Sequence, residues 1–316
     1  MIASQSKKNK YLMKRSKLLL AFLLCGLGVS AQDADSLMNQ LGGKSSNGPV
    51  NATFKSTRIV LSHSTETQKK YDLDLRIRHH FGDIGGEFGD SHTLFGLDGA
   101  TDLYIGLDYG ITNKLTVGVG RSKHDELYNL FLKQKLVQQS DKFPFSTTLL
   151  AQSAWITRKE RTFNELQDGR SSYFFQALIA SKLSEHLSLQ ISPGYLIREQ
   201  MEDPLDEKGL FTAGIGGRLK LSKRMAFIAD YQLVNLTRSD KLAKTYYNPL
   251  GVGLEIETGG HIFSLNFMNS EYIVENNFLP GTNKSWTDGG VRFGFTISRN
   301  FTLHKSKNPD IDSKIY

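Results

Sequence analysis

Residues 101–110 read TDLYIGLDYG, and this stretch shows the pattern that decides the fold. Leu103, Ile105 and Leu107 alternate with small or polar residues. A period of two indicates a β-strand, because successive side chains point to opposite faces of a sheet. The same alternation recurs over residues 71–302, and many segments have the length that a tilted strand needs to cross a bilayer.

The connections between these segments give a second signal. Short and long connections nearly alternate, with a tight link near Lys123 as the exception. Outer-membrane barrels have short periplasmic turns and longer outer loops. The sequence therefore predicts an all-β fold, an antiparallel up-and-down transmembrane β-barrel of about twelve strands, with a range of ten to fourteen. Short turns are expected near 112–113, 140–141, 184–185, 222–223 and 259–260, and long polar loops near 81–100, 158–170, 199–208, 235–247 and 270–289.

The N-terminus has the layout of a secretory signal peptide. A stretch with bases and no acids precedes the apolar run 18–29, and Val29-Ser30-Ala31 supplies small residues for cleavage. The apolar run is short for a membrane-spanning helix. We therefore predict a cleaved signal at residues 1–31 and a location in the cell outer membrane.

Composition excludes several classes of function. The only cysteine, Cys25, lies in the predicted signal, so disulfides and thiolate chemistry are not expected in the mature chain. Six leader bases account for most of the net charge of +7, which leaves about +1 for the mature chain. We therefore predict no nucleic-acid partner.

Residues 32–70 form an N-terminal segment before the predicted barrel. Asp33 to Leu41 is a candidate short helix, and Thr53 to Ser64 is strand-like. Counting Thr53 to Ser64 as a strand gives thirteen strands, whereas a barrel with both ends of its strand set in the periplasm needs an even number. We therefore expect this segment to pair with the barrel, insert into it or plug it. Residues 303–316 are expected to form a C-terminal tail.

Six short motifs carry a family resemblance. They are GPVNATFK at 48–55, HFG at 80–82, LFGLDGA at 94–100, DYGIT at 108–112, VGVGRS at 117–122, and GGH at 259–261 followed by Phe263 and Leu265. In combination they resemble an uncharacterised outer-membrane β-barrel family, a domain of unknown function from Gram-negative, Bacteroidetes-type bacteria. The resemblance implies a barrel in the outer membrane and brings no catalytic residue.

The polar face of the strands predicts the lumen lining. Acidic and basic residues are balanced on this face, which argues against strong ion selectivity. Arg76 and Arg78 are expected to pair with nearby carboxylates, because an unpaired buried charge is costly. Glycines there would make room in a narrow or partly occluded lumen. The predicted lumen-facing residues are Asp72, Asp74, Arg76, Arg78, Asp108, Arg218, Lys220, Glu255, Glu257 and Arg292, with Asp102, Lys133, Lys135 and Asp230 on the same face.

Aromatic residues near the segment ends predict interfacial girdles, where rings with an apolar body and a polar tip meet the lipid headgroups. The alternative is the ordinary preference of strands for aromatic residues. The residues are Tyr104, Tyr109, Tyr128, Trp155, Tyr173, Tyr195, Tyr231, Tyr246, Tyr247 and Trp286.

Two constellations could carry chemistry. Imidazole and carboxylate groups gather near the first long loop and suit a divalent metal, although their spacing matches no known motif. The alternative is a solvated loop, with His80 in the lumen and His79 at the rim. His186 and Ser188 have the spacing of a barrel lipase, but they face inward near a turn and are better interpreted as polar turn residues. The weak metal candidates are His79, His80, Asp83, Glu87, Asp90 and His92.

The leading functional interpretation is a non-enzymatic outer-membrane barrel without cofactors, either a narrow channel or a structural and binding barrel. Its expected partners are outer-membrane lipid and the barrel-assembly machinery during biogenesis. One alternative is a lipid-modifying barrel enzyme such as an outer-membrane lipid hydrolase, which an outward-facing polar dyad would favour. The other is a soluble periplasmic β-sandwich that binds an apolar ligand.

Overall fold

The computed structural model describes residues 52–86, 89–159, 169–201, 203–234, 238, 242 and 244–304. The predicted signal peptide, the candidate helix at 33–41 and most of the C-terminal tail lie outside these residues. Within the described part of the chain, no helix has the length and apolar character needed to cross a membrane.

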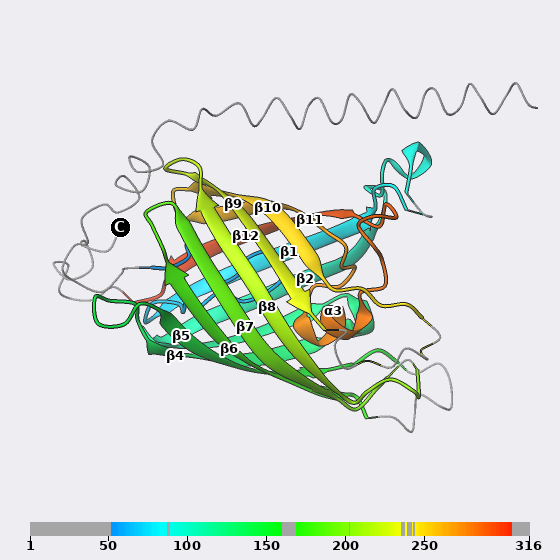
Figure 1. Cartoon of the computed structure of the whole chain (residues 1–316), viewed down its shortest axis with the longest axis horizontal. Coiled ribbons are helices and arrows are strands. Elements are labelled where there is room, and N and C mark those ends of the chain that lie inside the picture. Colours follow the sequence, from blue (N-terminus) through cyan, green and yellow to red (C-terminus); the bar gives the residue numbers. More distant parts are fainter. Residues whose placement is uncertain are drawn as a thin grey trace, which may run out of the picture. The chain divides into compact units, whose positions relative to one another are not determined.

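Twelve antiparallel strands form a closed barrel (Figure 1), which confirms the predicted fold and strand number and excludes the β-sandwich. Each strand pairs with its neighbours in the chain, and β1 pairs with β12 to close the barrel. The strands are β1 (Asp72–Asp83), β2 (Ala100–Thr112), β3 (Leu115–Ser122), β4 (Tyr128–Val137), β5 (Ser146–Trp155), β6 (Ser171–Lys182), β7 (Leu187–Arg198), β8 (Gly209–Lys220), β9 (Met225–Leu233), β10 (Leu250–Thr258), β11 (His261–Met268) and β12 (Arg292–Thr302).

The two faces of the wall follow the alternation of the sequence. In β2, Ile105 and Leu107 are 50% and 41% exposed on the outside, whereas Asp102 and Asp108 are buried inside. Such an outward apolar band is stable only against lipid. Tight connections such as 113–114, 183–186, 221–224 and 259–260 gather at one end, the short-turn end, and the opposite end carries most of the longer loops.

The girdle prediction is wrong for Tyr104. Its side chain is 3% exposed and points into the barrel. Its ring occupies the space above two lumen glycines, since a Cβ built on Gly106 would lie 2.6 Å from the ring of Tyr104, and Gly120 lies under the same ring. Glycine is therefore required at these positions for the ring to turn inward.

Residues 52–70 are here called the plug; most of them lie inside the barrel, and Lys69 and Lys70 are exposed at the short-turn end. The plug residues do not form the strand that the sequence suggested, and an isolated bridge between Arg58 and His63 is the β-pairing the structure describes within them. The Ser64 N–H donates to the Thr57 carbonyl at 3.0 Å, so the segment turns back on itself. The tip of this turn, residues 59–62, lies deep in the barrel, and its side chains are buried.

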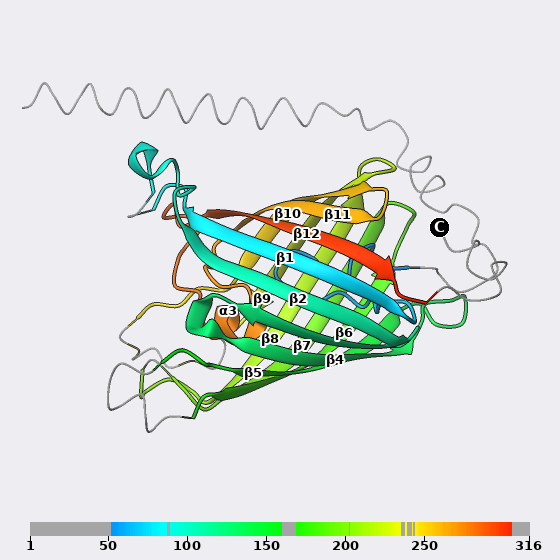
Figure 2. The same ribbon diagram turned by 180° about the vertical axis from the view of Figure 1, so that it is seen from behind.

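A second segment closes the barrel from the other side. The long loop between β11 and β12 folds inward and contains the helix α3 (Glu275–Gly281), which lies inside the wall in both views (Figures 1 and 2). The sequence predicted only a polar loop here. The helix has seven residues, contains Pro280 and lacks a side-chain cap, so it leaves no helical periodicity to detect.

Part of the lumen wall is apolar, which corrects the expectation that small and charged residues line it throughout. Inward-facing residues of β4 to β9 pack with the plug and with α3 in one hydrophobic core. The wall contributes Phe131, Leu150, Phe174, Leu196, Leu210 and Ile228, the plug contributes Phe54, Ile59, Val60 and Leu61, and α3 contributes Phe278 and Leu279.

Candidate functional site in the plugged lumen

Asp230 on β9 holds the tip of the plug. Its Oδ2 atom accepts hydrogen bonds from three successive backbone N–H groups, at 3.2 Å from Val60, 2.9 Å from Leu61 and 2.8 Å from Ser62. It also accepts one from the Ser62 hydroxyl at 2.7 Å. Successive N–H groups that converge on one anion form a strong charge-assisted site. The buried carboxylate therefore fixes the conformation of the turn.

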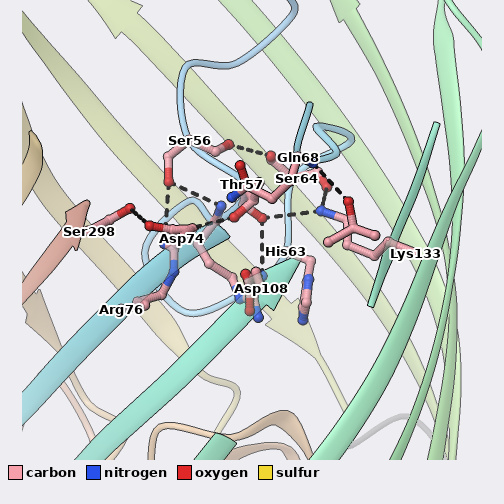
Figure 3. A network of polar contacts seen from close by, with 12 residues as sticks. Ser56, Thr57, His63, Ser64, Gln68, Asp74, Arg76, Asp108, Lys133 and Ser298 are labelled. Atoms are coloured by element: carbon pink, nitrogen blue, oxygen red, sulfur yellow. Dashed lines mark hydrogen bonds and ion pairs between the residues drawn. The ribbon is translucent and has the colours of Figure 1, made fainter. Parts of the chain in front are cut away.

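Lys133 on β4 holds the two legs of the same turn. Its Nζ atom donates to the carbonyl oxygens of Thr57 at 3.3 Å, Ser64 at 2.7 Å and Glu66 at 2.5 Å (Figure 3). The side chain is 1% exposed, so these three acceptors replace the water that an ammonium group would otherwise bind. The plug and the wall thus satisfy each other's polar groups.

Among the residues that the structure describes, Arg78 on β1 forms no ion pair with a carboxylate, contrary to the prediction. Its guanidinium donates to the carbonyl oxygens of Val60 at 2.7 Å and Ile273 at 3.2 Å. These two acceptors belong to the plug and to the inward-folded loop respectively. Arg78 therefore ties both closing segments to the same strand.

Arg76 pairs as predicted and also reaches the plug. It contacts Asp74 at 2.5 Å and donates to the Thr57 hydroxyl at 2.8 Å. Asp74 in turn accepts from Ser298 on β12 at 2.6 Å (Figure 3). A cavity with room for roughly one water molecule lies between this cluster and the wall.

Other charges of the lumen form close pairs. Lys135 lies 2.9 Å from Glu66 of the plug, and Arg58 of the plug lies 3.6 Å from Asp108. Asp102, Lys133, Lys135 and Asp230, predicted on the lumen face, are all buried. Of the other ten predicted lumen-facing residues, six are buried and four are half-buried near the short-turn end. The buried six are Asp74, Arg76, Arg78, Asp108, Glu255 and Arg292, and the half-buried four are Asp72, Arg218, Lys220 and Glu257.

The outer closing segment has its own anchors. Asp102 on β2 accepts from the Ile273 N–H at 3.0 Å and from the Ser122 hydroxyl at 2.7 Å. Gln152 on β5 donates to the side chain of Asn276 at 2.6 Å. Helix α3 and the residue Ile273 before it are therefore held by side chains of β5 and β2.

The metal candidates are spread over different surroundings. His79 faces outward and stacks on Phe295, with ring centroids 5.4 Å apart, whereas His80 is buried inside. Asp83 lies 2.7 Å from Arg292. Asp90 and His92 are exposed at the short 3-10 helix Ser91–Thr93, and Glu87 lies outside the described residues. In the part of the chain that the structure describes, no three such side chains are grouped to hold a metal ion.

The candidate lipase pair is divided between different environments. The Ser188 hydroxyl donates to the Thr53 carbonyl of the plug at 2.5 Å, and His186 is exposed at the turn. Ser188 thus belongs to the set of wall residues that contact the plug backbone. Sequence reasoning missed this set, because main-chain acceptors are the same in every sequence and leave no motif.

Fold and lumen together define a membrane-bound β-barrel closed by its own chain. Residues 54–301 match the family described as "Membrane bound beta barrel domain (DUF5777)", a domain of unknown function, and the chain belongs to this family. No curated protein has a significantly similar sequence.

Several solved structures are similar in fold. The NanC porin has a TM-score of 0.47 and 9% sequence identity, over 73% of this chain and 100% of that chain. An outer membrane channel from Pseudomonas putida F1 has a TM-score of 0.45 and 12% identity, over 75% and 98%. Outer membrane phospholipase A from Escherichia coli has a TM-score of 0.41 and 12% identity, over 75% and 93%.

Proposed function

We propose that this protein is a non-enzymatic outer-membrane barrel that its own plug holds closed, and that conduction requires displacement of the plug. One observation carries the proposal. Asp230 and Lys133, two buried charges on opposite parts of the wall, are both satisfied by backbone atoms of the plug. A wall built to pass solutes freely would keep such charges in contact with water.

The energetics favour the closed state. Removing one partner of a buried charged contact typically costs about 3–5 kcal/mol when the remaining charge is left without a partner. Displacing the plug would remove the hydrogen-bond partners of Asp230, Lys133 and Arg78 at the same time. It would also expose the apolar wall around Phe131. Water entering the lumen would offset part of this cost for the charges but not for the apolar wall.

Planar-bilayer recording tests the proposal. The purified full-length protein is expected to show little or no conductance. The double variant Asp230→Asn with Lys133→Met is expected to show frequent openings, because both anchors of the plug are weakened. Lys220→Met is the matched control for the lysine, since Lys220 is half-buried on the lumen face near the short-turn end. A large, steady conductance from the unaltered protein would show the closed state to be wrong.

Deletion of residues 32–64 is a second test of closure. It removes the turn that Asp230 and Lys133 hold, so the conductance should rise in a barrel that still inserts. No change in conductance would contradict a plugging role. The outer-membrane location is tested separately by membrane fractionation, where the protein should follow outer-membrane markers and run heat-modifiably on a gel.

A further inference from the structure

The wall contacts the plug mainly through the plug's backbone. Beyond Asp230, Lys133 and Arg78, three neutral side chains of the wall donate to plug carbonyl groups. Gln190 donates to His63 at 2.8 Å, Thr148 to Thr65 at 2.7 Å and Ser188 to Thr53 at 2.5 Å. Toward the exit, the Gln68 N–H donates to the Thr116 hydroxyl at 2.8 Å.

These contacts come from several strands between β1 and β9. Thr116 lies on β3, Lys133 on β4, Thr148 on β5, Gln190 on β7 and Asp230 on β9. Thr116 and Asp230 accept hydrogen bonds from plug N–H groups, whereas Lys133, Thr148 and Gln190 donate to plug carbonyl groups. This is the arrangement that a peptide turn needs, because each of its residues offers one donor and one acceptor.

The wall also leaves space for the side chains at the tip of the turn. A Cβ built on Gly251 would lie 2.6 Å from Cγ1 of Val60, and one built on Gly216 would lie 2.6 Å from Cδ1 of Ile59. Both glycines therefore admit the tip of the turn. Larger residues at these positions would push the tip away from Asp230.

We propose that the lumen is a binding site for polypeptide backbone, and that a peptide turn entering at the short-turn end competes with the plug for it. The inference rests on the proposed closed state and adds the class of ligand that can replace the plug. Backbone atoms do not depend on sequence. The site therefore accepts turns of different sequence, provided that their side chains fit the space around the tip.

Cleavage of the folded protein allows a direct test. Lys69 and Lys70 are exposed at the short-turn end, so a protease site placed between them can be cut after the barrel has formed. The freed segment is washed out in urea, and retention of the barrel is checked by heat-modifiable mobility. Binding of a fluorescent synthetic peptide of residues 52–68 is then measured by anisotropy.

N-methylated peptides separate backbone recognition from side-chain recognition. N-methylation at Leu61 removes a donor to Asp230 and keeps the side chain, so affinity should fall roughly tenfold or more. N-methylation at Lys55 is the matched control, because in the described structure this N–H meets no wall group, and affinity should stay within about twofold. Asp230→Asn in the barrel should weaken binding of the unmethylated peptide. It should also remove most of the difference in affinity between the two methylated peptides.

The outcomes distinguish this inference from the closed state itself. If conductance rises after the segment is washed out, but no peptide binds, backbone recognition is wrong and closure stands. Equal affinities of the two methylated peptides would also overturn the inference. Binding of the unmethylated peptide together with a return to low conductance would support both.

Discussion

The Nε2 atom of His63 lies 3.6 Å from the Oε1 atom of Glu275, and both side chains are buried. His63 belongs to the plug, which enters at the short-turn end, and Glu275 begins the helix that folds in from the opposite end. The two closing segments therefore meet inside the lumen. Because they touch, disturbing one is expected to change the stability of the other.

Asp230→Asn should loosen the plug without changing the size of the side chain. The amide oxygen still accepts hydrogen bonds, but the charge-assisted contribution, about 1.5–3 kcal/mol, is lost. A cysteine at Val60, in a Cys25→Ser background, should then react about tenfold to a hundredfold faster with an impermeant maleimide. Asp72→Asn at the short-turn end is the control and should leave the rate unchanged. An unchanged rate in Asp230→Asn would contradict the role of this carboxylate.

Gly251→Ala should open the barrel by a purely steric route. The added Cβ would lie 2.6 Å from Cγ1 of Val60, closer than real contacts allow, and 3.0 Å from its Cβ, which is a tight contact. Overpacking of this kind costs about 1–3 kcal/mol. Single-channel recordings should show more frequent openings. Gly217→Ala is the control, since its Cβ would meet the flexible end of Leu189 at 3.2 Å and the Ser188 carbonyl at an ordinary 3.6 Å. Equal opening frequencies in the two variants would refute the steric role.

Asp102→Asn should release the outer closing segment. The carboxylate accepts from the Ile273 N–H and from the Ser122 hydroxyl, so loss of its charge weakens the anchor of the loop by about 1–3 kcal/mol. A cysteine at Phe278 should become accessible to maleimide. When it is combined with Asp230→Asn, the change in the free energy of channel opening should differ from the sum of the two single changes by at least about 0.5 kcal/mol, because the closures touch. Strict additivity would show that they act independently.

Leu107→Arg should destabilise the barrel from outside. Leu107 is 41% exposed in the apolar band, and an arginine at the bilayer midplane costs about 2–4 kcal/mol. The free energy of unfolding in lipid vesicles measures the loss, with Leu107→Phe as the neutral control. If arginine is tolerated as well as phenylalanine, this face does not contact lipid.

The wall of the barrel was predictable because its signals are local. Alternation, strand length and the order of short and long connections depend on neighbouring residues only, and they gave the twelve strands of the structure. An even number of strands left no place in the wall for residues 53–64, and in the structure these residues lie inside the barrel. Their irregular backbone was not predictable, since it is set by contacts with distant wall residues such as Asp230.

The apolar half of the lumen could not be assigned for a different reason. Leu130-Phe131-Leu132 is a continuous apolar run; its spacing of two from Lys133 puts Phe131 on the inner face, but nothing in the run says what an inward apolar ring would pack against. The structure turns Phe131 inward against His63, with ring centroids 4.9 Å apart. Partners on α3 and on the plug supply that packing, and neither was visible in the local pattern.

The position of the plug in the chain bears on how the protein is made. It directly precedes β1, whose Arg76 and Arg78 both donate to plug atoms no more than twenty residues away. These contacts are short-range, whereas the seam between β1 and β12 waits for the last strand of the chain. In an unfinished, open sheet the plug could therefore already bind the guanidinium groups of Arg76 and Arg78. Chains that lack the plug are expected to assemble more slowly, because β1 would have to enter the membrane while those two charges have no hydrogen-bond partners from the plug.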